Sequence, residues 1–336
     1  MKAIAYYSSL PILHDDALVD IEIEQPIATG RDLLVKISAI SVNPVDCKIR
    51  KNVAPQGQAK VLGWDAVGVV DDVGDEVSLF KIGDAVYYAG DITRSGSNAE
   101  YQLIDERLVG FKPLTLSDAE AAALPLTSIT AWEMLFERLD INKPATRKPL
   151  LLVIGGAGGV GSILIQLAKH LSQATVIATA SRQESQAWVK DLGADYVLDH
   201  SQPLKAQIEA LNLGQVSHVA CTTHADQHFV ALIEILKPQG KLGIIEFSGS
   251  AVDLNLLKDK SISLHWEFMF TRGKYQTEDM IEQHHLLNRI ATLIDEGLVK
   301  STLGNNLGSI NAKNLRAAHA LSESNKAIGK IVLEGF

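Results

Sequence analysis

Hydrophobic and polar positions follow two different rhythms along the chain. From Met1 to about Pro125, short alternating segments such as DLLVKISAI and DAVGVVDDVG are separated by turns rich in Gly, Pro and Asp. This pattern predicts antiparallel strands at the spacing of a barrel. From about Lys148 to Ser250, uninterrupted apolar runs alternate with helical patterns. The runs read PLLLVIG, ATVIATA, DYVLD, SHVACT and KLGIIEF.

Uninterrupted apolar strands indicate a sheet that is covered on both faces. The second region is therefore expected to be a doubly wound parallel sheet, which makes the chain an α/β protein. A mixed segment follows, with SISLHWEFMF, a helical stretch TEDMIEQHHLLNRIATLIDEG and a final strand KIVLEG.

A glycine-rich turn connects the first parallel strand to the next helix. Gly156, Gly158 and Gly161 stand at G-x-G-x-x-G spacing between LLVIG and SILIQLAKHL. Glycines allow a tight turn and close approach of the backbone, while the helix N-terminus offers free N–H groups to a pyrophosphate. The turn predicts dinucleotide binding, and a glycine turn in an α/β fold that binds no nucleotide is the alternative. The expected contacts are Gly156, Gly158, Gly159, Val160 and Gly161.

The end of the second strand distinguishes between dinucleotides. An acidic side chain there would bind a ribose 2′-hydroxyl. This chain reads TASRQES, with Ser181 and Arg182 at the corner and no carboxylate. A hydroxyl and a guanidinium favour a 2′-phosphate, and hence NADPH over NADH. In the alternative interpretation, Arg182 is a solvated residue that pairs with Glu184.

Composition narrows the class of protein. The 336 residues are 46% hydrophobic and 21% charged, as in ordinary globular proteins. The net charge of −9 without a basic stripe argues against nucleic acid as a partner. Two cysteines, Cys47 and Cys221, favour a reducing compartment, so we expect a cytoplasmic location. No apolar run approaches ~20 residues without glycine, which predicts no membrane span.

Several motifs together resemble one family. They are SVNPVDCKIR, LGWDAVGVV, IGDAVYYAG, AAALPLTSITAWEML, GGAGGVG, SRQES, LGAD and IGKIVL. The chain resembles the medium-chain dehydrogenase/reductase superfamily, in particular its zinc-free quinone oxidoreductase-like branch. The resemblance implies a GroES-like barrel domain over residues 1–125, a Rossmann-type NADP-binding domain over 126–260, and a C-terminal segment over 261–336 that completes the catalytic domain. It also implies a cleft for the nicotinamide between the domains, and assembly as a homodimer or homotetramer.

The resemblance also bears on zinc. Zinc-dependent members hold a catalytic metal with two cysteines and one histidine. The matching positions here resemble Asn43, Trp64 and Pro125, none of which supplies a thiolate or an imidazole. His224 and His228 have a spacing that can clasp a metal on one helix face, but no third ligand is evident. We therefore expect no catalytic metal.

Without a Lewis acid, oxidation of a simple alcohol is disfavoured. A quinone or an α,β-unsaturated carbonyl instead accepts hydride at an electron-poor carbon, and hydrogen-bond donors suffice to stabilise the charge on oxygen. The resemblance thus implies an NADPH-dependent reductase of quinones or activated alkenes. Two alternatives stay open: an alcohol or aldehyde dehydrogenase that retains a metal, and an NADPH-binding structural or stress protein with little turnover.

Family positions supply further candidates. Asn43, Asp46 and Lys48 are candidate catalytic residues; loop architecture is the alternative role for the first two. Additional cofactor contacts are expected at Thr130, Thr222, Phe247, Ser248 and Lys330. Aromatic residues expected to line the acceptor pocket are Trp64, Trp266, Phe268 and Phe270, although an apolar cluster would explain them equally well.

Overall fold

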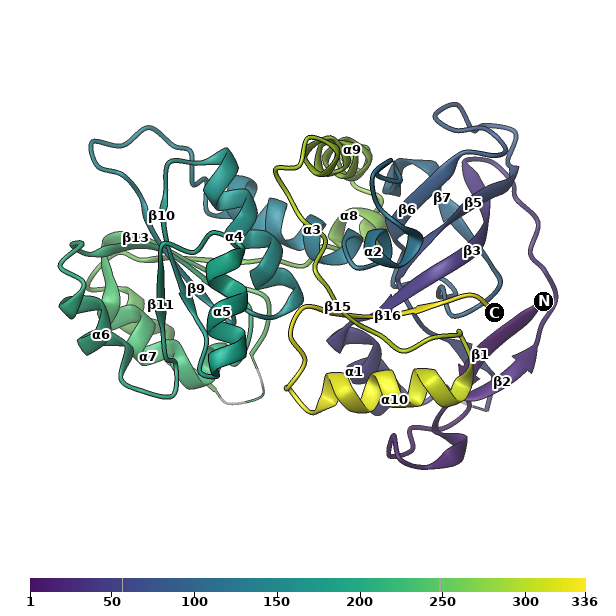
Figure 1. Ribbon diagram of the computed structural model, residues 1–336, viewed down its shortest axis with the longest axis horizontal. Coiled ribbons are helices and arrows are strands. Elements are labelled where there is room, and N and C mark those ends of the chain that lie inside the picture. Colours follow the sequence, from purple (N-terminus) through teal and green to yellow (C-terminus); the bar gives the residue numbers. More distant parts are fainter. Residues whose placement is uncertain (56, 248, 250) are drawn as a thin grey trace. The chain divides into compact units, whose positions relative to one another are not determined.

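The computed structural model describes residues 1–55, 57–247, 249 and 251–336. The chain forms two compact units (Figure 1). Unit 1 contains Met1–Ile129 and Phe270–Phe336, and unit 2 contains Thr130–Met269. These limits differ from the boundaries predicted at residues 125 and 260. Among the described residues, no helix is both long and apolar enough to cross a membrane.

Unit 1 contains two sheets built mainly from antiparallel strands. The smaller sheet has the order β2 (Val19–Glu22), β1 (Lys2–Tyr6), β4 (Lys60–Val61). The larger sheet has the order β15 (Leu303–Asn306), β16 (Lys330–Glu334), β3 (Asp32–Val42), β5 (Asp65–Val73), β6 (Ala85–Ala89), β8 (Val109–Phe111), with β7 (Tyr101–Asp105) also beside β3. Strands β15 and β16 pair in parallel, and the other neighbours in these sheets pair antiparallel.

The register of the larger sheet brings distant residues together. Ser41 on β3 lies opposite Asp65 on β5, and Val42 lies opposite Ile331 on β16. Lys330 precedes Ile331, so the first residues of β5 and β16 meet at the end of β3. A polar cluster can therefore form here from three segments that are far apart in sequence.

The helices of unit 1 come from both ends of the chain. They are α1 (Pro44–Asn52), α2 (Asp118–Ala122), the first part of α3 (Pro125–Trp132), α8 (Thr271–Tyr275), α9 (Glu282–Asp295) and α10 (Ala312–Glu323). Helix α1 begins at a proline, whose fixed φ suits the first helical position. The Asn43 N–H donates to Asp46 Oδ2 at 2.8 Å and caps this end of the helix.

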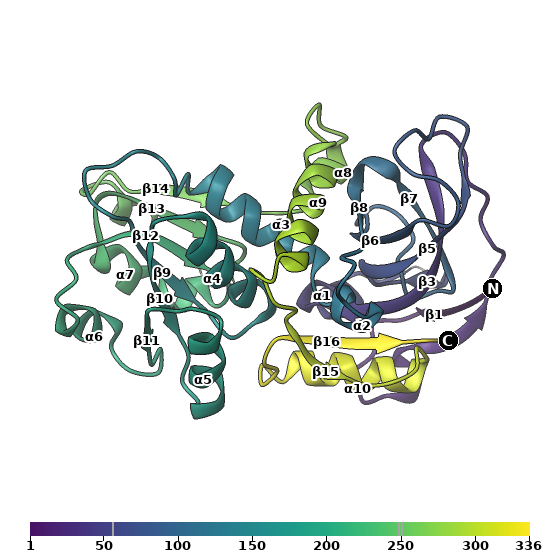
Figure 2. The same cartoon turned by 45° about the horizontal axis from the view of Figure 1, so that its top comes forward.

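Unit 2 is built on one six-stranded parallel sheet. Its order is β11 (Tyr196–Leu198), β10 (Thr175–Thr179), β9 (Leu150–Ile154), β12 (Val216–Cys221), β13 (Leu236–Ile244), β14 (Ser263–Trp266). Its main helices are α4 (Gly159–Leu171), α5 (Gln183–Asp191), α6 (Leu204–Ala210) and α7 (Ala225–Ile235), with a π-helical segment at Glu133–Arg138. In Figures 1 and 2, α4 and α5 lie on one side of this sheet and α6 and α7 on the other.

The sheet confirms the predicted fold class. Every residue of β9 is buried, as expected for a strand with helices on both faces. The five predicted apolar runs correspond to β9 to β13. Strand β14 extends the sheet past residue 260 because it pairs in parallel with β13, although only four residues long. Its mixed apolar and polar sequence gives a weaker pattern than the other strands.

Candidate functional site

The glycine turn of unit 2 is packed too tightly for side chains at most positions. Gly155 has a positive φ of 80°. A Cβ at Gly161 would lie 2.3 Å from the Gly155 carbonyl oxygen, and a Cβ at Gly156 would lie 3.0 Å from the Cβ of Ala178. These glycines are therefore required by the packing of α4 against the turn and the sheet.

Gly158 differs from its neighbours because its side-chain position is open. A Cβ there would find only the Gly155 oxygen, at 3.5 Å, and the φ of −75° suits any residue. Gly158 also caps α4 without a side-chain hydrogen bond, and the first N–H groups of a helix have no acceptor within it. Open space beside free N–H groups at a positive helix end fits a pyrophosphate.

The end of β10 presents the predicted 2′-phosphate residues. Ser181 and Arg182 are both exposed and lie between β10 and α5. The Arg182 backbone N–H donates to Ser185 Oγ at 3.2 Å, which fixes the start of α5. The acidic residue of the first turn is Glu184. The strand end itself therefore offers a hydroxyl and a guanidinium, without a carboxylate.

The remaining predicted cofactor residues of unit 2 have different surroundings. Thr130 is buried in α3. Thr222 Oγ1 donates to the Ile154 carbonyl at 2.8 Å and so ties the ends of β9 and β12 together. Phe247 contacts Trp266 edge to face, with ring centroids 5.2 Å apart. Phe268, a residue predicted to line the acceptor pocket, is 43% exposed. Ser248 lies outside the described residues.

In unit 1, four donors converge on the buried carboxylate of Asp65. Ser41 Oγ donates to Oδ2 at 2.7 Å, and Asn43 Nδ2 donates to the same oxygen at 2.8 Å. The Leu126 N–H donates to Oδ1 at 2.7 Å, and Lys330 Nζ lies 3.0 Å from Oδ2. Asp65 is fully buried and Lys330 is 4% exposed. We call Ser41, Asn43, Asp65, Leu126 and Lys330 the Asp65 network.

Lys330 uses its ammonium group entirely within this region. Besides Asp65, it donates to the Val42 carbonyl at 3.1 Å and to Asn43 Oδ1 at 2.5 Å. An ammonium has three donors, so these contacts occupy all of them. The expected cofactor contact of Lys330 stays a prediction, while its observed position is that of the counter-ion of Asp65.

The Asp65 network includes or adjoins the three positions that the resemblance matches to zinc ligands. Asn43 belongs to it directly, Trp64 precedes Asp65, and Pro125 precedes Leu126. An amide, an indole and a proline ring do not form a zinc ligand set. Trp64 is buried and meets Phe270 edge to face, with centroids 5.8 Å apart. These residues do not fit a metal at this position.

Asp46 and Lys48 both lie on α1 but in contrasting surroundings. Asp46 is buried, and burial raises its carboxyl pKa to about 7, against the lowering effects of the Asn43 N–H and Lys330. Its Oδ1 atom is buried without a hydrogen-bond partner among the described residues. Lys48 is exposed. Asp46 thus belongs with the Asp65 network, and Lys48 faces solvent.

A group of metal-type side chains lies elsewhere in unit 1. Among the described residues, Cys47, His319 and Glu323 have ligand atoms within 4.8 Å of one another. The Glu323 carboxylate already pairs with Arg50 at 2.6 Å and Lys51 at 3.0 Å. Burial raises the pKa of the Cys47 thiol to about 12, so metal binding would have to displace a tightly held proton.

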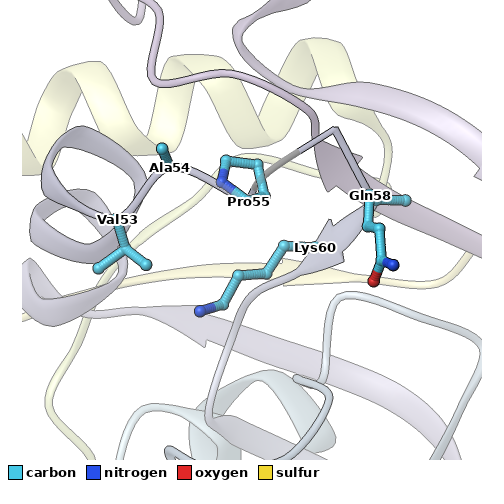
Figure 3. A pocket seen from close by; sticks show the side chains of 6 residues that line it. Val53, Ala54, Pro55, Gln58 and Lys60 are labelled. Atoms are coloured by element: carbon cyan, nitrogen blue, oxygen red, sulfur yellow. The ribbon is translucent and has the colours of Figure 1, made fainter.

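A hollow of about 340 Å³ lies beside the end of α1. Figure 3 shows Val53, Pro55 and Lys60 around it, with Ala54, Gln58 and Ala59 completing the lining. None of the predicted catalytic residues lines it. Its described lining therefore offers one ammonium, one amide and apolar surface, but no group suited to proton transfer at neutral pH.

Sequence reasoning does not single out Asp65 as a site residue. Its partners are up to 265 positions away in sequence, so no local pattern announces them. A usable signal is nevertheless present, because a carboxylate opens an otherwise apolar strand in WDAVGVV. A buried charge needs a partner, and that need could have directed attention to the lysine of IGKIVL.

Comparison with known proteins identifies the family. Residues 29–115 match the alcohol dehydrogenase GroES-like domain, and residues 192–333 match the zinc-binding dehydrogenase family. A zinc-type alcohol dehydrogenase-like protein of Staphylococcus epidermidis is 40% identical over 99% of both chains. The 2-methylene-furan-3-one reductase of Solanum lycopersicum is 36% identical over 74% of this chain and 66% of its own.

Solved structures agree with this assignment. A crystal structure from Rhizobium etli CFN 42, described as a candidate zinc-dependent alcohol dehydrogenase, is 53% identical, with a TM-score of 0.97 over 100% of this chain and 98% of that one. A mycobacterial protein solved with NADPH is 28% identical, with a TM-score of 0.84 over 99% and 100% of the chains. The chain belongs to the medium-chain dehydrogenase/reductase superfamily and is an oxidoreductase of the alcohol dehydrogenase-like type.

Proposed function

We propose that this oxidoreductase reduces quinones or α,β-unsaturated carbonyl compounds with NADPH and without a catalytic metal. The Asp65 network carries the proposal. At the positions that the resemblance matches to zinc ligands, this chain has Asn43, Trp64 and Pro125. The positive charge beside Asp65 is the Lys330 ammonium. The similarity to a 2-methylene-furan-3-one reductase supports the acceptor class. The similarity to a mycobacterial protein solved with NADPH supports the cofactor.

The residues of unit 2 fit NADPH in two places. The open space at Gly158, with the N–H groups of Gly159, Val160 and Gly161 at the start of α4, suits the pyrophosphate. Ser181 and Arg182 suit the 2′-phosphate, because a guanidinium and a hydroxyl bind phosphate oxygens. NADPH, when bound, supplies a hydride. The protein's task is to orient the acceptor, exclude water and stabilise the charge that develops on oxygen.

Asn43 has a constrained role in this scheme. One N–H of its amide donates to Asp65, and its carbonyl accepts from Lys330. An amide nitrogen has two donors, so a single N–H remains for an acceptor oxygen. The network thus fixes the orientation of the amide before substrate binds, which is the condition for efficient electrostatic stabilisation. Asp46, with its raised pKa, is the nearby group suited to proton transfer around neutral pH.

The two alternatives make different demands. A metal-dependent alcohol or aldehyde dehydrogenase would need a ligand set, for which Cys47, His319 and Glu323 are the candidates in the described part of the chain. An NADPH-binding structural or stress protein would need the cofactor site alone. Its expected signature is NADPH binding without consumption of NADPH.

The proposal is tested by following NADPH oxidation at about 340 nm with quinones, enones and simple aldehydes, each with and without a chelator. We expect turnover of quinones or enones that the chelator leaves unchanged, with aldehydes inert. Aldehyde turnover that the chelator abolishes would overturn the proposal in favour of a metal enzyme. The substitution Cys47→Ser is the control that should leave enone turnover unchanged.

A further inference from the structure

Three histidines of unit 2 gather beside the strand end that carries Ser181 and Arg182. His200 follows β11, His224 immediately precedes α7, and His228 lies in the first turns of α7. The rings of His200 and His228 meet edge to face, with centroids 6.5 Å apart. His224 accepts or donates a hydrogen bond with Thr223 Oγ1 at 2.6 Å. We call these residues the histidine trio.

The order of strands places the histidine trio at the nucleotide edge of the sheet. His200 follows β11 and the other two follow β12, and these strands are separated by β10 and β9. Three strand spacings amount to about 14 Å. The contact between the rings of His200 and His228 therefore bridges the interval between the ends of β11 and β12, in which the ends of β10 and β9 lie. Those ends carry Ser181 and the glycine turn, and a dinucleotide binds outside the carboxyl ends of such strands.

The register of β10 and β11 gives His200 and Ser181 equivalent positions after their strands. Thr179 pairs with Leu198, and the Ala180 N–H donates to the Leu198 carbonyl at 2.9 Å. Ser181 and His200 each lie two residues beyond this last pair, in the segments that follow the two strands. His200 Nδ1 is buried without a hydrogen-bond partner in the described structure. A ring with an unused nitrogen therefore lies one strand away from the proposed 2′-phosphate position.

From this arrangement we infer that the histidine trio is part of the 2′-phosphate subsite and that two of its members, His200 and His228, make this subsite proton-dependent, so that the preference for NADPH over NADH increases as the pH falls. The inference rests on the proposed use of NADPH. It adds three residues to the site formed by Ser181 and Arg182, and it makes phosphate binding at that site depend on pH.

Charge accounts for the direction of the effect. Burial lowers the pKa of His200 and of His228, and histidine neighbours lower each pKa further, so these surroundings favour the neutral rings in the free protein. A bound phosphate dianion opposes those effects and favours the protonated rings. By linkage, protons that favour phosphate binding must themselves be bound more tightly when phosphate is present.

The other charged groups near the histidine trio determine how favourable phosphate binding is before the histidines are protonated. Asp199 raises the pKa of His200 and Asp226 raises the pKa of His228, so each carboxylate favours protonation of its neighbouring ring. Asp199 Oδ1 accepts hydrogen bonds from the backbone and hydroxyl of Ser201, at 2.9 and 2.7 Å, which holds that oxygen in a local turn. Glu184 in the first turn of α5 opposes phosphate binding, and Arg182 favours it. While His200 and His228 are neutral, these carboxylates weaken phosphate binding, and protonation of the two rings reverses that balance.

The test compares the dissociation constants of NADPH and NADH, measured by fluorescence titration from about pH 8 to about pH 6. For the unmodified chain we expect the ratio of the NADH to the NADPH constant to rise as the pH falls, by at most about tenfold for each unit by which phosphate raises a histidine pKa. In His200→Gln and His228→Gln the rise should be reduced, and in the double variant it should be absent. His285→Gln, an exposed histidine of unit 1, is the matched control and should behave as the unmodified chain.

The outcomes are distinguishable. NADPH preferred equally at every pH would overturn this inference while leaving the proposed cofactor intact. An undiminished rise in the double variant would also overturn it, because a group other than His200 and His228 would then cause the rise. The 2′-phosphate itself titrates near pH 6, but it loses charge on acidification and would therefore weaken the preference for NADPH. Failure to bind NADPH at any pH would overturn the proposed function and this inference together.

Discussion

At the scale of single residues, the Asp65 network joins the beginnings of two strands, a loop and a helix through one carboxylate. Removing either charged partner would leave an uncompensated charge in the interior, which is costly. This centre is internally satisfied, since the Lys330 ammonium has three acceptors and Asp65 has four donors. Asp46 stands beside it with one oxygen that has no partner among the described residues.

Asp46 gives a pH-dependent prediction. The ordinary pKa of an aspartate is 3.8, and that of Asp46 in the folded protein is about 7, so the native state binds the proton more tightly than the unfolded state. The contribution of Asp46 to stability therefore falls as the pH rises from about 4 to about 7, by at most about 1.4 kcal/mol per pH unit, and is constant above that range. Asp46→Asn, which keeps an oxygen for the Asn43 N–H, should remove this dependence.

Urea unfolding of both proteins across this range measures the effect. We expect Asp46→Asn to gain stability relative to the unmodified chain as the pH rises. A constant difference at every pH would contradict a raised pKa at Asp46. Asp16→Asn, an exposed carboxylate, serves as the control.

The sequence predicts some of these residues but not how they come together. Asn43, Asp46 and Lys330 are identifiable through their motifs, yet their convergence depends on the register of β3 with β5 and β16. Register is fixed by packing across the whole sheet and is not encoded locally. The same reason explains why the sequence shows the histidine trio only as the pair His224 and His228. The third member belongs to another strand.

At the scale of elements, the strand, glycine turn and helix over residues 150–171 are predictable because each part has its own strong pattern. Strand β9 is continuously apolar, and α4 begins within the glycine turn, at Gly159. Strand β14 is not recognisable in the same way, because four residues of mixed polarity carry little periodicity. Its place in the sheet comes from pairing with β13.

The glycine turn gives a matched pair of substitutions. In Gly158→Ala the new methyl group has open space and an ordinary φ, so we expect unchanged stability but NADPH binding weakened on the order of tenfold or more, since the methyl enters the pyrophosphate space. In Gly161→Ala the methyl meets backbone atoms at 2.3 Å, so both stability and binding should fall. Thermal unfolding and NADPH titration separate the two effects. Equal NADPH affinity of Gly158→Ala and the unmodified chain would place the pyrophosphate elsewhere.

At the scale of the whole molecule, association of several copies is a further expectation. In the described part of unit 2, β14 pairs on one side only, and Trp266 on this strand is 52% exposed. An unpaired strand edge with apolar side chains is a natural place for a second chain to pair. We expect light scattering to give twice or four times the chain mass of 36.4 kDa. A mass of one chain at high concentration would contradict this expectation.

The central claim is that hydride reaches a conjugated carbon without help from a metal. The most direct measurement is the position of deuterium in the product, when protein stripped of metal reduces an enone with NADPH deuterated at the transferable hydrogen. We expect a saturated ketone with deuterium on the carbon β to the carbonyl, at the rate of untreated protein. Deuterium on the carbonyl carbon of an allylic alcohol, with activity restored only by added metal, would contradict the claim.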